Sequence, residues 1–101
     1  MTKDEAIARI EGLADGYSRF KIGKTGQTIE DRFNSEYADE YDGIHPICNS
    51  TNKALIDQWE IDLIEHFQEA PGYAGKCDND AVGGGDMGVS TTYRIYVVGK
   101  S

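Results

Sequence analysis

The segment FKIGKTGQTIEDRF, residues 20–33, carries the structural signal on which the fold of this chain depends. Its first part belongs to an alternating run over residues 17–24, in which Phe20 and Ile22 lie on the same side. Alternation with a period of two predicts a β-strand with one buried face. Gly26 ends this pattern, so the segment predicts a strand that stops at a turn.

A helix is predicted to follow this turn, because Thr28 and Asp31, three positions later, match a capping pattern. Lys21, Lys24 and Arg32 surround the turn, although the chain of 101 residues carries a net charge of −8. Broad non-specific binding of nucleic acid depends on many cations that neutralise phosphates, so the overall acidity argues against it. Any role with nucleic acid would therefore have to use a local basic patch, or a metal that offsets the acidic charge.

The rest of the chain predicts a single α+β domain over residues 1–101. Apolar side chains recur at helical or alternating intervals in four further segments. These are helices over residues 3–14 and 53–68 and strands over residues 45–50 and 92–100. An acidic connection over residues 36–42 and a glycine-rich loop over residues 72–92 separate them, and a loop of that length is usually functional.

The composition predicts a cytoplasmic protein without a membrane span. No apolar run approaches the length of about 18 residues that a span requires, and the N-terminus lacks the features of a signal peptide. Cys48 and Cys77 are expected to be reduced and partly buried. A zinc site formed by these cysteines with His45 and His66 is the alternative, although no ligand spacing supports it.

Glu60 is out of place on the predicted helix over residues 53–68. The apolar side chains of this helix form a wide stripe that comprises Leu55, Ile56, Trp59, Leu63, Ile64 and Phe67. Glu60 falls inside this stripe, where a carboxylate must be paired, protonated or bound to a metal ion. The alternatives to a metal site are a position at the edge of the stripe, open to water, or an ion pair with an arginine.

Arg32 also has two interpretations. Its spacing from Glu36 permits an ordinary ion pair across one helical turn, worth a few tenths of a kcal/mol. Its closeness to the buried face, one turn from Ile29, instead suits a guanidinium that binds a phosphate in a cleft.

Taken together, these residues resemble the motifs of the GIY-YIG nuclease superfamily. In that family a strand ending in Tyr-Ile-Gly leads into a helix with an essential arginine, and Ile22, Gly23 and Arg32 match this pattern. The form with Lys21 in place of the tyrosine is similar to a divergent branch found among phage and mobile-element proteins. The family's metal-binding glutamate precedes an apolar Leu-Ile-x-x-Phe pattern, which places it at Glu60.

Two later segments extend the resemblance. The family often has an asparagine and then glycines after the glutamate helix, as at Asn79 and residues 83–85. Residues 94–98 are similar to the family's Gly-Ile-Tyr strand, with Tyr96 as its tyrosine, although they follow the second motif instead of preceding it. The resemblance thus implies a circularly permuted GIY-YIG-like fold, with a small antiparallel sheet of about three strands flanked by helices. The alternative is that these residues form an additional strand.

The resemblance implies a metal-dependent endonuclease that hydrolyses DNA phosphodiester bonds. One divalent cation, Mg²⁺ or Mn²⁺, would bind to Glu60. Arg32 would offset the charge on the phosphoryl group, and Tyr96 would orient or deprotonate the attacking water. Lys21, at the position of the second tyrosine, would contact the phosphate; the alternative is that its presence means lost activity. The candidates for substrate binding are Lys24 and Asn79.

Two other function classes stay open on the sequence. The same fold could be a non-catalytic module that binds nucleic acid or a protein partner, with Glu60 and Arg32 paired. The net charge and Lys21 favour this interpretation. An acidic inhibitor that mimics DNA is the third class, to which the acidic residues 36–42 point.

Overall fold

The computed structural model describes residues 1–80 and 87–101. The elements in chain order are α1 (Lys3–Ala14), β1 (Arg19–Thr25), α2 (Ile29–Arg32), the π-helix η1 (Phe33–Tyr37), β2 (Gly43–Ser50), α3 (Lys53–Glu69), the 3₁₀-helix η2 (Ala74–Lys76) and β3 (Tyr93–Lys100). The predicted helices and strands are present, with small shifts at their ends. The helix capped by Thr28 differs from the prediction, because it changes to a π-helix after one turn.

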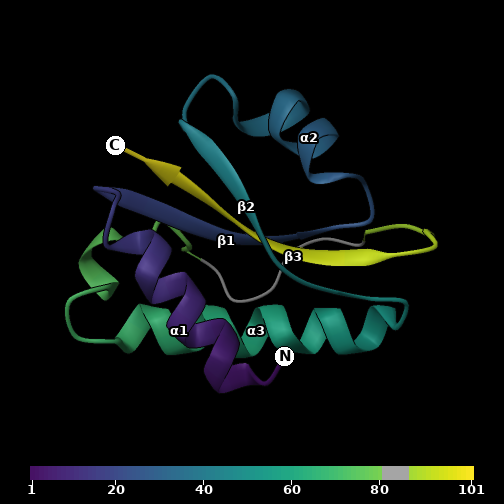
Figure 1. The fold of residues 1–101 in the computed structure, drawn as a ribbon, viewed down its shortest axis with the longest axis horizontal. Coiled ribbons are helices and arrows are strands. Elements are labelled where there is room, and N and C mark those ends of the chain that lie inside the picture. The colour runs from purple at the N-terminus through teal and green to yellow at the C-terminus, as the bar shows by residue number, and fades with distance from the viewer. Residues whose placement is uncertain (81–86) are drawn as a thin grey trace.

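The three strands form one antiparallel sheet in the order β1-β3-β2, so the last strand of the chain is central (Figure 1). β3 pairs with β1 in a register that sets Gly23 opposite Tyr96. This confirms the α+β class and the predicted antiparallel pairing of residues 93–99 with residues 18–24. The arrangement leaves β1 at an edge of the sheet.

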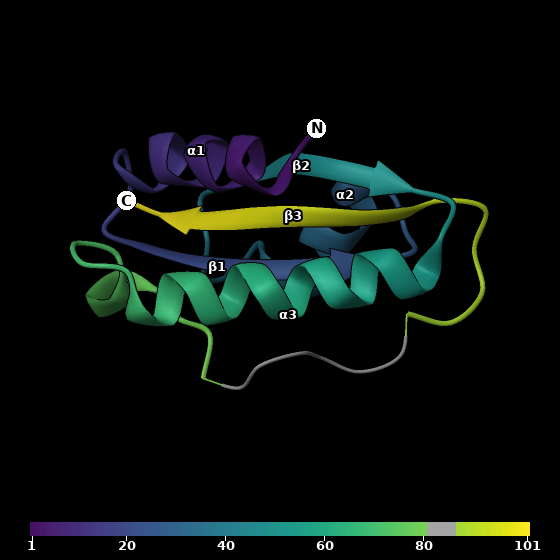
Figure 2. The same ribbon diagram turned by 90° about the horizontal axis from the view of Figure 1, so that it is seen from below.

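Helices cover both faces of the sheet. α1 and α3 lie side by side on one face, and α2 with η1 lies on the other (Figures 1 and 2). The alternating side chains of β3 serve both layers, because Ile95 and Val97 belong to the core beneath α1 and α3, whereas Tyr96 and Val98 belong to a smaller cluster beneath η1. The larger core also contains Ala6, Ile10, Ala14, Phe20, Ile22, Ile47, Ile56, Leu63, Ile64, Phe67 and Tyr93.

The free edge of β1 is covered by the segment that follows η2. Cys77 forms a parallel bridge with Phe20, and the backbone N–H of Asp78 donates to the Phe20 carbonyl at 2.7 Å. The side-chain amide of Asn79 then continues this pairing. It donates to the Ile22 carbonyl at 2.8 Å and accepts from the Ile22 N–H at 2.9 Å. These contacts satisfy backbone groups that an edge strand otherwise exposes.

The predicted loop over residues 72–92 is therefore partly ordered against the sheet, through the turn of η2 and the pairing after it. The sequence alone gives no sign of this pairing, because an edge contact needs few apolar residues. The predicted role of Gly83, Gly84 and Gly85 beside the site lies outside the described residues.

The two cysteines are free and partly buried, as predicted. Within residues 1–80 and 87–101, no group of three or more His, Cys, Asp or Glu side chains is arranged to hold a metal ion. His45 instead shares a hydrogen bond of 2.8 Å with the Tyr17 hydroxyl, and the zinc alternative therefore has no support from the described residues. The helices of this part of the chain also include none with the length and apolar character needed to cross a membrane.

Candidate functional site

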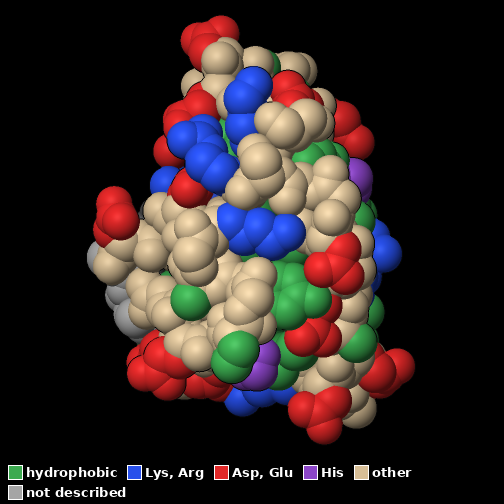
Figure 3. Space-filling model, turned by 90° about the vertical axis from the view of Figure 1, so that its left-hand side faces the viewer, with side chains coloured by type: hydrophobic (Ala, Val, Ile, Leu, Met, Phe, Trp, Pro, Cys, Tyr) green, Lys and Arg blue, Asp and Glu red, His purple; other side chains and the backbone are tan. Residues whose placement is uncertain are grey.

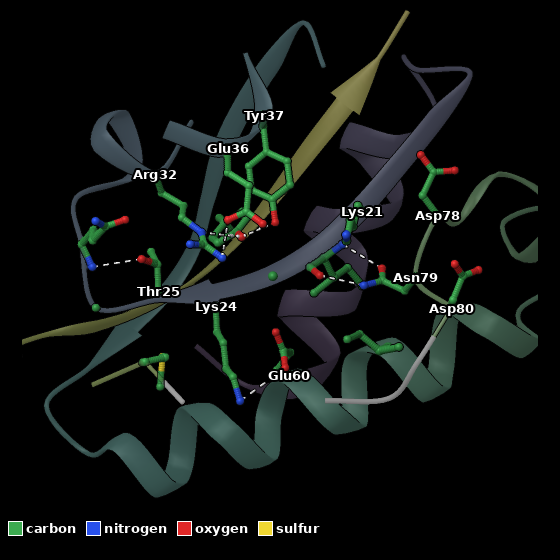
Figure 4. A pocket seen from close by; sticks show the side chains of 17 residues that line it. Lys21, Lys24, Thr25, Arg32, Glu36, Tyr37, Glu60, Asp78, Asn79 and Asp80 are labelled. Carbon is green, nitrogen blue, oxygen red and sulfur yellow. Dashed lines mark hydrogen bonds and ion pairs between the residues drawn. The ribbon is translucent and has the colours of Figure 1, made fainter. Parts of the chain in front are cut away.

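A cavity of about 650 Å³ lies along the free edge of β1, between α3 and the layer of α2 and η1 (Figure 4). Five elements (β1, α2, η1, α3 and β3) and the segment after η2 contribute its walls, although they are distant in sequence. All six predicted site residues line it: Lys21, Lys24, Arg32, Glu60, Asn79 and Tyr96. The structure thus brings the candidates together around one space.

Gly23 is required because Tyr96 lies directly over it. A Cβ atom at residue 23 would stand 2.3 Å from the Tyr96 hydroxyl oxygen and 2.4 Å from Cζ, far inside van der Waals contact. Tyr96 is fully buried, so its ring has no free space into which it could move. The glycine of the Lys-Ile-Gly run therefore lets a side chain of the central strand reach the edge strand.

The Tyr96 hydroxyl is held by two other side chains. Arg32 donates to it from Nε at 3.3 Å, and the Tyr37 hydroxyl shares a hydrogen bond of 2.7 Å with it. Burial raises the pKa of Tyr96, and the hydrogen bond from Arg32 opposes this shift without cancelling it. Tyr96 is therefore a protonated phenol at neutral pH. This favours the predicted orienting role over deprotonation of a water molecule.

The π-helix places Tyr37 in this cluster. In an α-helix the side chain one turn after Arg32 is that of Glu36, and the predicted ion pair between them is present at 2.7 Å. The wider turn of η1, with bonds from i to i+5, also brings Tyr37 beside Arg32, whose guanidinium lies 5.8 Å from the ring centroid. Tyr37 was not among the site residues predicted from the sequence. The π-turn has no propensity signal that distinguishes it from an α-turn.

Glu60 is buried in the opposite wall of the cavity, as its place in the apolar stripe predicted. The Lys24 ammonium lies 3.5 Å from its Oε1 atom, which is an ion-pair distance without hydrogen-bond geometry. Oε1 has no hydrogen-bond donor among the described residues. Burial raises the pKa of Glu60, and the charge of Lys24 partly offsets this effect. The ion pair considered from sequence, between Glu60 and Arg32, is replaced by separate pairs with Lys24 and Glu36.

β1 runs between the two halves of the site (Figure 4). Glu60 and Lys24 lie on the side of α3, and Arg32 and Tyr37 lie on the side of η1. Lys21 points to the second side, where its ammonium lies 5.9 Å from the centroid of the Tyr37 ring. Glu60 and Arg32 therefore line one cavity, with the edge of β1 between them.

The two predicted substrate-binding residues already have partners in the protein. Asn79 lines the cavity with Glu60, but both the oxygen and the nitrogen of its side-chain amide are hydrogen-bonded to the backbone of Ile22. Lys24 donates a hydrogen bond of 2.9 Å to Asp57, one turn before Glu60 on α3. Both side chains therefore shape the site, whatever further contacts they make.

The carboxylate of Glu60 fits a magnesium or manganese ion better than a structural metal. Mg²⁺ retains several waters and typically binds one or two carboxylates together with substrate phosphates. A buried carboxylate oxygen without a donor, beside an open cavity, meets the protein's part of this requirement.

Figure 3 shows the face of the molecule where β1 begins and the chain ends. On this face, basic side chains lie among acidic ones and form no continuous basic surface. Arg19 at this end of the sheet pairs with Glu40 at 3.2 Å, and Lys100 pairs with Asp42 at 3.7 Å. These cations are neutralised locally.

Comparisons with known protein families, curated proteins and solved structures give no match to this chain. The function of the cavity has to be derived from its own residues. Their chemistry combines a buried carboxylate, a guanidinium, two hydrogen-bonded phenols and two lysines on an edge strand.

Proposed function

We propose that this protein is a metal-dependent endonuclease that hydrolyses DNA phosphodiester bonds in the cavity along β1. The observation that supports this most strongly is the buried Glu60 Oε1 atom, which lacks a hydrogen-bond donor among the described residues. Leaving a buried carboxylate oxygen without a donor costs stability. A divalent cation would compensate this cost, and the cavity gives it access.

Each remaining group has a role in phosphodiester hydrolysis. Arg32, whose side chain is 31% exposed, presents its guanidinium to a phosphate while Tyr96 fixes its Nε end. The Tyr96 phenol, held by Tyr37, orients the attacking water by hydrogen bonding. Lys21 adds a positive charge on the same side of β1. Glu60 would hold a divalent cation, which would supply Lewis-acid stabilisation of the leaving oxygen.

The mixed charge of the cavity agrees with such a reaction in an acidic protein. Glu60 and Glu36 would repel a phosphate on their own, so productive binding requires the cation. The proposal therefore predicts that DNA binding as well as cleavage depends on Mg²⁺ or Mn²⁺.

A non-catalytic module that binds nucleic acid or a protein partner is the second candidate. The internal ion pairs of Lys24 and Arg32 favour it, because both cations already have carboxylate partners. In that case Glu60 is one half of a structural pair. The same cavity would then recognise a ligand without breaking a bond.

A nicking assay on supercoiled plasmid, in the presence of Mg²⁺ or Mn²⁺, tests the proposal. Wild-type protein is expected to open the plasmid, and Glu60→Gln is expected to abolish this activity. Glu65→Gln is the matched control, because Glu65 is an exposed carboxylate on the same helix. Equal nicking by wild type and Glu60→Gln, or no nicking with either cation, would contradict the proposal.

A further inference from the structure

We infer that Lys24 is an internal counter-ion for Glu60 that a divalent cation has to displace, so that Lys24 sets the cation affinity of the cavity. This inference rests on the proposed cation site at Glu60. It adds to that site a positioning residue from β1 that is not a cation ligand.

Lys24 lies between two carboxylates of α3, those of Asp57 and Glu60, and Figure 4 shows it pointing toward Glu60. Its Nζ atom lies 3.5 Å from Glu60 Oε1 and 2.9 Å from Asp57 Oδ1. The side chains of Lys24 and Glu60 are only 8% and 6% exposed, whereas that of Asp57 is 39% exposed. The ammonium thus neutralises a buried carboxylate while it stays anchored to one nearer the solvent.

The two contacts of Lys24 differ in kind. The contact with Asp57 is a hydrogen bond, and the contact with Glu60 is a longer approach that leaves Oε1 without a donor. A buried pair that serves stability alone is expected to satisfy its oxygens with hydrogen bonds. Here the weaker contact falls on the buried carboxylate that faces the cavity.

This asymmetry lowers the free-energy cost of displacing the Lys24 ammonium from Glu60 Oε1. When a cation approaches Glu60, Lys24 moves away from Oε1 but keeps its hydrogen bond to Asp57. Neither the ammonium nor the Asp57 carboxylate is then left alone in the protein. Because the ammonium and the cation repel each other near the same oxygen, their occupancy of this position is competitive.

Without a bound cation, Lys24 balances the charge of the buried carboxylate, although it donates no hydrogen bond to Oε1. Two other charged groups also influence Glu60: Asp57, which is hydrogen-bonded to Lys24, and Arg32, which acts across the edge of β1 and has its own partner in Glu36. Lys24 is therefore the cation in contact with Glu60 among the described residues.

The test is a titration of the full chain with Mn²⁺, in which the free ion is measured by electron paramagnetic resonance. Lys24→Met is expected to bind Mn²⁺ at least about tenfold more tightly than wild type. The Lys24 ammonium repels a cation at Glu60, and the repulsion between charges this close corresponds to more than a tenfold change in Kd. Arg32→Gln is the charge-matched control. It removes a positive charge from the same cavity, but not one in contact with Glu60, and is expected to change the affinity less. Glu60→Gln is expected to lose the site.

Each outcome of this titration decides the inference. If wild type binds Mn²⁺ through Glu60 and Lys24→Met binds no more tightly, or if Arg32→Gln has an equal effect, the inference is overturned while the nuclease proposal stands. If neither wild type nor Lys24→Met binds Mn²⁺, both are overturned.

A second variant keeps the inference testable if Lys24→Met does not fold. Asp57→Asn retains Lys24 but weakens its anchor, so the ammonium is expected to move toward Glu60 and Mn²⁺ binding is expected to weaken. Unchanged or tighter binding by Asp57→Asn would overturn the inference.

Discussion

Replacing Gly23 with alanine tests whether Tyr96 lies over β1 as described. The added Cβ would stand 2.3 Å from the Tyr96 hydroxyl oxygen, so the ring and the strand have to separate by about an ångström or more to reach ordinary contact. Tyr96 is fully buried, and its hydroxyl is bound by Tyr37 and Arg32. Overpacking of this kind costs about 1–3 kcal/mol, and the altered hydrogen bonds add about 1 kcal/mol.

The reduced freedom of alanine in the unfolded chain offsets up to about 1 kcal/mol of this cost. A net loss of about 2 kcal/mol lowers the Tm of a domain of this size by roughly 8–16 °C. Thermal unfolding followed by circular dichroism measures this shift directly.

Gly12→Ala provides the matched control for this experiment. Gly12 is exposed in α1, and a Cβ there meets no atom within 4 Å. Alanine is favoured over glycine inside a helix by roughly 0.5–1 kcal/mol, so the same substitution is expected to raise the Tm. If Gly23→Ala melts at or above the wild-type temperature, Tyr96 does not occupy the described position, and the arrangement of the site is wrong.

Two further predictions concern the site. Tyr37→Phe removes the hydroxyl that is hydrogen-bonded to Tyr96, so it is expected to lower the free energy of unfolding by about 1–2 kcal/mol and to lower the nicking rate. A variant with the nicking rate and stability of wild type would show that this hydrogen bond has no role. The second prediction is that Glu60 makes the stability depend on pH. Burial raises the pKa of Glu60 above the ordinary value of 4.5. The contribution of Glu60 to the free energy of unfolding is therefore fully present below pH 4.5 and is lost as the pH rises through the higher pKa of the folded state. The free energy of unfolding of wild type relative to Glu60→Gln, from urea titrations on both sides of 4.5 and at neutral pH, should therefore fall with rising pH, and a constant or rising difference would be inconsistent with a strained buried carboxylate.

Much of the fold follows from local patterns in the sequence. Period-two alternation predicted β1, and the apolar stripe of α3 predicted that Glu60 is buried. The expectation that β1 pairs with β3 came instead from the resemblance of residues 94–98 to a family strand, because periodicity does not encode the order of strands in a sheet. These features depend on the burial of apolar side chains, which sequence patterns record well.

The partners of the polar groups were less predictable. Lys24 and Glu60 are distant in sequence, and nothing in either segment indicates that they meet. Arg32 was correctly paired with Glu36, since that contact is local, but Tyr37 enters the cluster only through a π-turn. Ion pairs and hydrogen bonds between elements depend on how these elements finally pack against one another. A shift of one residue in the register of a strand or helix changes them.

The most direct test of the proposed cation site is the Tm of wild type and Glu60→Gln with and without Mg²⁺ or Mn²⁺. A cation that binds the folded protein at tenfold above its Kd stabilises it by about 1.4 kcal/mol, which corresponds to a Tm increase of roughly 6–11 °C. We expect this increase for wild type and not for Glu60→Gln. We also expect Glu60→Gln without cation to be close to wild type in stability, because Lys24 retains Asp57 as its partner. A wild-type Tm that no cation changes, together with a loss of about 3 kcal/mol in Glu60→Gln, would contradict the cation site and identify Glu60 as half of a structural ion pair.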